Sequence, residues 1–309
     1  MIQNSTSKPS EVGSRADLIH LAGEIGGRDK WVTPDELVAA AKARGLKVTW
    51  PDIYGLYNRS HLRASGSFVI PTFLTEFIGA YIKEWNAHSM LDPWVGIGSL
   101  LLPVMESGNV SKGVGIGSNT REIQLAQAMS TRPVEWLTEE PETVLDKLGT
   151  FDVVVSSPAW GGRTTAVKIE APSGPIEVRD SKPIVTALMA ATHISDSGEA
   201  IFILPNSFFF STQASSVRDA LPKLGLSIHA IITLPAGSLS PFTTIESHLV
   251  FEAQSNRSFC RTVESRTEPQ DAPRESQELC VPSAHWNFSR SIGVVRSADQ
   301  TAQLRPASR

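Results

Sequence analysis

The chain has 309 residues and a mass of 33.5 kDa, with 41% apolar and 19% charged residues. This composition suits one large or two small globular domains and excludes a wholly disordered chain, a collagen-like chain and a disulfide-stapled miniprotein. The net charge of −4, from 28 basic and 32 acidic residues, argues against tight independent binding of nucleic acid. It leaves room for a local basic groove or a basic partner subunit.

Membrane, secretory and metal-binding features are all missing from the sequence. No apolar run reaches the ~20 residues that span a bilayer, and the longest runs, near 201–210 and 228–234, are typical of buried strands. The polar N-terminus lacks the apolar stretch of a signal peptide, so we expect a cytoplasmic protein. Cys260 and Cys280 have no histidine cluster nearby, and the histidines form no HxH or HxxxH pair, so neither a metal site nor a disulfide is predicted.

The first part of the chain is predicted to be a leader followed by helices. Residues 1–14 are polar without an apolar period, which is typical of disorder. Residues 15–64 form a predicted helical segment, with one helix over 16–26 and a second that begins at Thr33 and stops at Gly45. Thr33, Pro34 and Glu36 are the residues of a capping box with proline in the first turn. This segment carries no recognisable chemistry, and we interpret it as a helical cap or a module for partner docking.

Residues 65–252 alternate strand-like and helix-like stretches. Strands are predicted at 89–92, 113–117, 151–156, 198–204, 228–234 and 248–251, and helices at 72–85, 99–106, 121–129, 184–193 and 215–221. Strands separated by helices of this length indicate βαβ units, hence an α/β fold with a mostly parallel sheet covered on both faces. Residues 253–309 lose the pattern and are predicted to be a polar, partly ordered tail.

The clearest chemical signal is the segment Asp92-Pro93-Trp94-Val95-Gly96-Ile97-Gly98, between a predicted strand and a predicted helix. Glycines at the carboxyl end of a parallel strand let the backbone approach a ligand, and the following helix offers free N–H groups. An acid at the strand end can hold a positively charged or hydroxylated ligand. Alone, the segment is also compatible with a tight strand–helix turn that binds nothing.

A second signal follows the buried strand at 151–156, where the chain reads Ser157-Pro158-Ala159-Trp160. A small polar residue and a backbone carbonyl can accept hydrogen bonds from an exocyclic amine, and an aromatic ring offers a stacking face for a flat base. Taken alone, a plain strand-to-loop turn explains this tetrapeptide equally well.

Together and in this order, these segments resemble the N6-adenine DNA methyltransferases, and most closely the modification subunit of type I restriction–modification systems. Asp92–Gly98 is similar to the DPxxGxG motif of that family, and Ser157–Trp160 to its [NDS]-P-P-[FYW] motif. The segment Gly66–Pro71 is similar to G-x-[FY]-[FY]-T-P. The later segments 198–206 and 231–244, with their LPN and LPAG sequences, resemble the late strands of that subunit.

The resemblance implies a Rossmann-like seven-stranded fold that binds S-adenosylmethionine and methylates DNA together with a sequence-specificity subunit. Asp92 would meet the methionine amino group, and Trp160 would stack on a flipped adenine. Ser157 and the Pro158 carbonyl would polarise the amino group of that adenine. The implied cofactor-binding residues are Pro71, Asp92, Pro93, Gly96, Gly98 and Gly117. Since the chain shows no target-recognition domain, specificity would come from a partner in a hetero-oligomer.

This sequence also departs from the family pattern. Ser157 replaces the usual Asn or Asp, as in enzymes that methylate the cytosine amino group, which leaves the target base open. Ala159 replaces the second proline, and Ile70 replaces the threonine of the TP pair. Gly117 stands where the family has an acid for the ribose, while Glu139 or Glu140 stands where it has an acid near the adenine. The alternative hypothesis is a catalytically degenerate methyltransferase fold that serves as a DNA-binding or scaffolding subunit.

Overall fold

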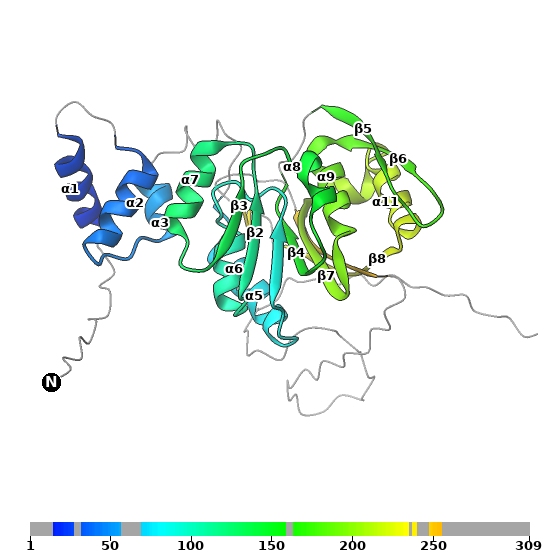
Figure 1. Ribbon diagram of the computed structural model, residues 1–309, viewed down its shortest axis with the longest axis horizontal. Coiled ribbons are helices and arrows are strands. Elements are labelled where there is room, and N and C mark those ends of the chain that lie inside the picture. The colour runs from blue at the N-terminus through cyan, green and yellow to red at the C-terminus, as the bar shows by residue number, and fades with distance from the viewer. Residues whose placement is uncertain are drawn as a thin grey trace, which may run out of the picture.

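The computed structural model describes residues 15–27, 32–56, 69–158, 163–234, 237–239 and 247–254. Within these ranges, three N-terminal helices precede a central sheet that is flanked by helices (Figure 1). The predicted α/β class and Rossmann-like arrangement are confirmed. The predicted leader and nearly all of the predicted tail, including both cysteines, lie outside the described residues, and the domain boundaries stay predictions.

The N-terminal helices form a small core of their own. They are α1 (Arg15–Gly26), α2 (Pro34–Ala43) and α3 (Trp50–Leu56). The Thr33 backbone N–H donates to Glu36 Oε2 at 3.1 Å, as the predicted capping box requires. Leucines of α1 and α2 and Ile53 of α3 are fully buried against one another and against α7 (Thr120–Met129). We refer to α1–α3 as the helical cap.

The main sheet in the described part of the chain has seven strands in the order β3-β2-β1-β4-β7-β9-β8. Their bounds are β1 Ser89–Asp92, β2 Lys112–Ile116, β3 Val134–Leu137, β4 Phe151–Ser156, β7 Ile194–Pro205, β8 Leu226–Thr233 and β9 Ser247–Gln254. The neighbouring strands from β3 to β7 pair in parallel, whereas β9 is antiparallel to both β7 and β8. β9 is therefore the last described strand in the chain, yet it lies inside the sheet.

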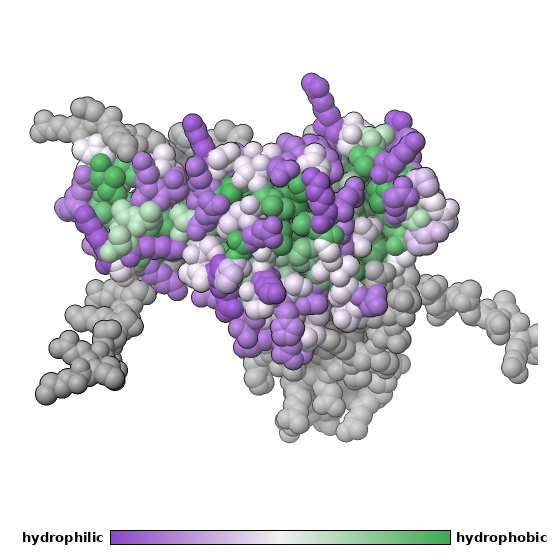
Figure 2. Space-filling view, in the orientation of Figure 1, coloured by the Kyte–Doolittle hydropathy of each residue, from purple (hydrophilic) through white to green (hydrophobic). Residues whose placement is uncertain are grey.

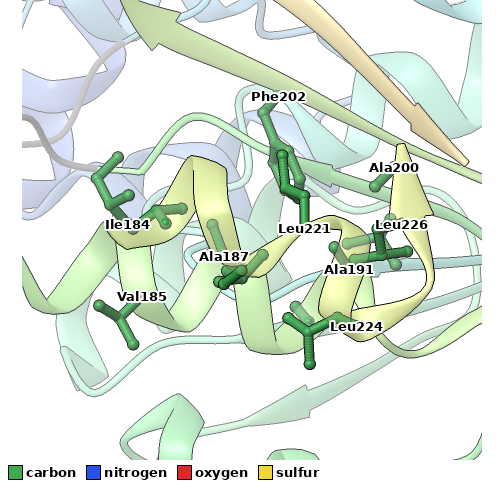
Figure 3. Close-up of a cluster of buried hydrophobic side chains, with 14 of the residues drawn as sticks. Ile184, Val185, Ala187, Ala191, Ala200, Phe202, Leu221, Leu224 and Leu226 are labelled. Atoms are coloured by element: carbon green, nitrogen blue, oxygen red, sulfur yellow. The ribbon is translucent and has the colours of Figure 1, made fainter. Parts of the chain in front are cut away.

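Both faces of the sheet are buried, which explains the continuous apolar runs in its central strands. On one face, Val153, Val155 and Ile201 pack against α5 (Thr72–Lys83) and α6 (Leu101–Ser107). The alternate residues Val154, Ala200 and Phe202 pack on the other face against α9 (Lys182–Ala191) and α11 (Ser215–Ala220). Figure 3 shows Phe202 and Leu221 meeting side chains of α9 in this second core.

The remaining elements are short helices and turns, and a two-stranded hairpin that packs against α9 and α11. They are α8 (Pro141–Val144), α10 (Ser207–Phe210), the 3₁₀ turns Leu145–Lys147 and Pro222–Leu224, and the antiparallel hairpin of β5 (Thr164–Ile169) and β6 (Ile176–Ser181). The hairpin was not predicted. Polar residues dominate its visible surface and that of the helical cap, with apolar residues between them (Figure 2). Of the described helices, none combines the length and apolar character needed to cross a bilayer.

A close approach of α5 and α6 gives a first testable prediction. A Cβ added to Gly79 would lie 1.8 Å from Ser107 Oγ and 2.9 Å from the Gly108 backbone nitrogen. We therefore expect Gly79→Ala to lower the free energy of unfolding by about 1–3 kcal/mol. Denaturant unfolding of Gly79→Ala beside Gly149→Ala, whose Cβ would meet nothing within 4 Å, measures the effect. Equal stability of the two variants would contradict this packing.

Candidate functional site

The two predicted motifs leave the sheet at the same edge. β1 ends at Asp92, and its parallel neighbour β4 ends at Ser156, with Leu91 level with Val154. After β1 the chain moves outward to β2 and β3, and then returns to β4 on the other side of β1. The crevice at such a reversal of strand order is where open α/β sheets bind ligands. The structure thus brings Asp92 and Ser157 to one expected binding position.

Asp92 is the buried acid of this edge, with 1% of its surface exposed. Its Oδ1 accepts a hydrogen bond from the Trp94 backbone N–H at 3.0 Å. Burial raises the pKa of Asp92 to about 7, and the hydrogen bond from the Trp94 N–H and the nearby Ser156 hydroxyl partly oppose this increase. Among the described residues, no basic side chain contributes to the pKa of Asp92, so this buried acid is poised to receive a cationic ligand.

The loop that follows Asp92 has the backbone geometry that its glycines predict. Gly96 and Gly98 have φ values of 50° and 83°, in the left-handed region that favours glycine. The loop is tied to the neighbouring strand by a 3.0 Å hydrogen bond from the Val95 N–H to the Ile116 carbonyl. A Cβ on Gly98 would lie 3.0 Å from Ala126 Cβ, so this position excludes larger residues on steric grounds as well. Pro93 is buried at the start of the loop.

The segment at 69–71 lies against this loop. The Ile70 backbone N–H donates to the buried Ser99 Oγ at 3.2 Å, and the Ile70 side chain is buried in the core below. Pro71 is half-buried directly before α5. Ile70, which replaces the threonine of the TP pair, therefore contributes packing to the core. The hydroxyl group that lies next to this segment belongs to Ser99.

Three polar groups at this edge have no hydrogen-bond partner in the described part of the chain. They are the indole Nε1 of Trp94, two residues after Asp92, the hydroxyl of Ser157, one residue after β4, and the hydroxyl of Ser156 at the end of β4. Because buried polar groups are nearly always hydrogen-bonded, unpartnered ones near a strand end are typical of a ligand site. The resemblance gives Trp94 no role, and its N–H becomes a candidate contact only in the structure. Pro158, next to Ser157, is buried.

Polar residues also gather where β2 and β3 end. Gly117 follows β2, and its N–H donates to the Leu137 carbonyl at 3.0 Å. Glu140 lies beside Ser118 and pairs with Lys182 Nζ at 2.7 Å, and Lys182 also pairs with Glu142 at 2.6 Å. The hydrogen bond from Lys182, together with Ser118, holds the pKa of Glu140 below its usual range. Glu140, one of the two acids named from the sequence, is therefore paired with Lys182 in the structure.

A further polar cluster at the same edge went unrecognised in the sequence. His248 of β9 is 7% exposed, with Nε2 lying 3.0 Å from Asn206 Oδ1 and Nδ1 lying 3.2 Å from Thr233 Oγ1. These contacts join the ends of β7 and β8 to the start of β9. The adjacent short helix α10 ends in Phe210, whose exposed fraction is 78%. The signal in the sequence was the polar pair Asn206 and His248 flanking otherwise apolar strands.

One predicted catalytic residue cannot be placed. Trp160 lies outside the described residues, as does Ala159, so the stacking role stays a prediction. Within the described ranges, no group of three or more His, Cys, Asp or Glu side chains is arranged to hold a metal ion.

Comparison with known proteins supports the fold. No protein-family model matches the sequence, and no curated protein matches it. A modification subunit assigned to a type I restriction enzyme of Vibrio vulnificus YJ016 superposes with a TM-score of 0.52 at 19% identity, covering 80% of this chain. The chain spans 60% of the length of that subunit.

A second similar structure is a protein of Listeria monocytogenes assigned as a class I S-adenosylmethionine-dependent methyltransferase. It has a TM-score of 0.55 at 15% identity, and the match covers 84% of this chain and 90% of that protein. The chain therefore has the fold of the class I S-adenosylmethionine-dependent methyltransferases, as the resemblance in its sequence predicted.

Proposed function

We propose that this chain is an S-adenosylmethionine-dependent DNA amino-methyltransferase of the type I modification-subunit kind, with adenine N6 as its target. In this proposal it works with DNA and a sequence-specificity subunit. The observation that carries the proposal is the buried Asp92 at the strand-order reversal, followed by the left-handed glycine loop and accompanied by the unpartnered Trp94 N–H and Ser157 hydroxyl.

These residues fit the cofactor chemically. The carboxylate of Asp92 suits an ammonium group, and the backbone at Gly96 and Gly98 allows close approach of a ligand. The unpartnered Trp94 Nε1 is a donor that suits a carboxylate or hydroxyl oxygen. S-adenosylmethionine, when bound, supplies a methyl group activated by a positively charged sulfur.

The contribution of the protein to transfer would be alignment and hydrogen bonding. The Ser157 hydroxyl and the Pro158 carbonyl accept hydrogen bonds from the amino group of the target base. These bonds orient the nitrogen lone pair toward the methyl carbon. The cofactor would supply the methyl group for a new nitrogen–carbon bond as its carbon–sulfur bond breaks, and the displaced proton of the amino group would leave to water. In-line transfer of this kind draws most of its rate from proximity and orientation.

The first experiment is calorimetric titration of the purified protein with S-adenosylmethionine and with S-adenosylhomocysteine. Binding with micromolar Kd is the expected result. An absence of heat at millimolar ligand, with folding verified by circular dichroism, would overturn the proposal in favour of the degenerate fold. Single-stranded oligonucleotides that contain adenine or cytosine as the sole amino-bearing target then determine which base is methylated. Mass spectrometry of the nucleosides is the readout.

The end of β2 gives a prediction of gained affinity. The nearest atoms to a Cβ at Gly117 would be the tip of the flexible Ile123 side chain, at 3.3 Å, and Val95 Cγ1, at 3.6 Å. Gly117→Asp therefore places a carboxylate where ribose hydroxyls are expected, and a charge-assisted hydrogen bond of about 1.5–3 kcal/mol should tighten cofactor binding by roughly tenfold or more. Calorimetry of Gly117→Asp beside the neutral Gly117→Asn measures the gain. Weaker binding by the Asp variant than by the Asn variant would contradict a ribose at this position.

A further inference from the structure

The side chain between the two loop glycines belongs to a different core from the rest of the loop. Ile97 is 2% exposed and packs in the core of the helical cap, with Leu18, Leu21, Leu37, Val38 and Ile53. By contrast, the loop residues Val95 and Leu100 pack in the core beneath the sheet, with α5 and α6. The glycine loop is therefore held from two sides.

The backbone explains this division. Gly96 and Gly98 both have positive φ, which turns the chain so that Ile97 leaves the sheet core and enters the cap. At Gly98, a Cβ would lie only 3.0 Å from Ala126 Cβ of α7, a tight contact. The same loop conformation that brings the backbone at Gly96 and Gly98 to the ligand side thus places the Ile97 side chain in the core of the cap.

Further contacts join the cap to the same region. Lys42 Nζ of α2 donates to the Ser130 carbonyl just after α7, at 3.0 Å. Val69 packs against the cap core, while the next residue, Ile70, donates to Ser99 in the loop. Figure 1 shows the cap lying beside α7 at one end of the molecule. The cap is therefore linked to the loop in two ways. Ile97, in the middle of the loop, packs into the cap core, and the segment 69–70 before α5 contacts both the cap core and Ser99.

We propose that the helical cap is part of the cofactor-binding apparatus, and that Ile97 is the positioning residue which links cap docking to cofactor affinity. This inference rests on the proposed function, because it concerns the same loop. Docking of α1–α3 fixes Ile97 and so holds the loop in its ligand-binding geometry. Linkage is reciprocal, so bound cofactor must stabilise the docked cap by the same free energy.

The test compares Ile97→Ala with Ile194→Ala. Both isoleucines are 2% exposed, but Ile194 lies at the start of β7, at the opposite edge of the sheet from the loop. Both variants should lose similar stability from the truncated core. Only Ile97→Ala should weaken S-adenosylmethionine binding, by about 5-fold to 150-fold, and Ile97→Val should restore most of the affinity. Equal affinities of the two Ala variants would overturn the inference.

Hydrogen exchange supplies a second readout that a purely structural role would not affect. Adding S-adenosylmethionine to the wild-type protein should slow amide exchange in α1 and α2, while exchange in the β5–β6 hairpin stays unchanged. If Ile97→Ala does not fold, Leu18→Ala in α1 serves instead, with the same expected loss of affinity. Wild-type binding with no change of exchange in the cap would refute the coupling and leave the proposed function intact, whereas an absence of wild-type binding would refute the proposed function itself.

Discussion

Replacing Asp92 by asparagine is expected to abolish S-adenosylmethionine binding and, in the same protein, to increase the free energy of unfolding at neutral and alkaline pH. Asp92 is 1% exposed, and burial raises its pKa to about 7 from an ordinary value of 3.8. The buried, ionised carboxylate of Asp92 destabilises the folded protein, and a bound cation would offset this destabilisation. Functional groups of this kind commonly reduce stability.

The pH dependence has a definite sign. Between pH 3.8 and about 7, the unfolded chain has released the Asp92 proton while the folded protein still holds it. Stability contributed by this group is therefore complete below pH 3.8, decreases as pH rises toward 7 and stays low above it. The separation of the two pKa values corresponds to about 4 kcal/mol. Asp92→Asn should match the wild type near pH 4 and exceed it by up to that amount at pH 8.

Thermal or denaturant unfolding from pH 4 to pH 8, together with cofactor titration, measures both effects. The matched control is Asp180→Asn, since Asp180 is also buried but accepts hydrogen bonds from the Ser181 N–H and the Gln213 amide. That variant should keep its cofactor affinity and gain no stability. Cofactor affinity equal to wild type in Asp92→Asn would remove Asp92 from the site.

The second large effect is expected at Ser157. Ser157→Ala should lower the rate of methyl transfer by about 100-fold or more, as for other preorganised hydrogen-bonding groups in active sites. The cofactor Kd should not change, because the Ser157 hydroxyl has no hydrogen-bond partner among the described residues and is assigned to the target amino group. Single-turnover transfer to single-stranded DNA, at saturating cofactor, isolates this step.

The neighbouring serine provides the control for that experiment. Ser156 is fully buried, and its hydroxyl lowers the pKa of Asp92. Ser156→Ala should therefore shift cofactor binding to higher pH with little change in the rate of transfer once the cofactor is bound. If instead both alanine variants reduce the transfer rate equally and leave binding unchanged, the separate roles assigned to the two serines are wrong.

Much of the sheet could be predicted because its strands are buried on both faces and carry continuous apolar runs. β4 begins and ends where the sequence indicates, and β1 ends at the predicted Asp92. β3 was missed because its residues Val134–Leu137 are short and partly exposed, so their pattern is weak. The β5–β6 hairpin was missed because polar residues interrupt the apolar ones in both strands, although Pro172, Ser173 and Gly174 form a recognisable turn between them.

The candidate site was predictable in part for a similar reason. Asp92, Gly96 and Gly98 are neighbours in sequence, so a local motif predicts them, and their positive φ values agree with that motif. The insertion of Ile97 into the helical cap depends on contacts with residues such as Leu18, far away in the chain, which no local pattern contains. The same holds for the contact of Asn206 with His248 across β7 and β9.

The position of β9 has a consequence for how the chain folds during synthesis. β9 pairs with β7 on one side and β8 on the other, although β8 precedes it in the chain. Until β9 leaves the ribosome, β7 remains an apolar edge strand with unpaired backbone groups, and β8 has no partner in the sheet. Exposed edges of this kind are templates for aggregation. Nascent chains that end before residue 247 should therefore depend on chaperones, whereas those that have released residue 254 should not.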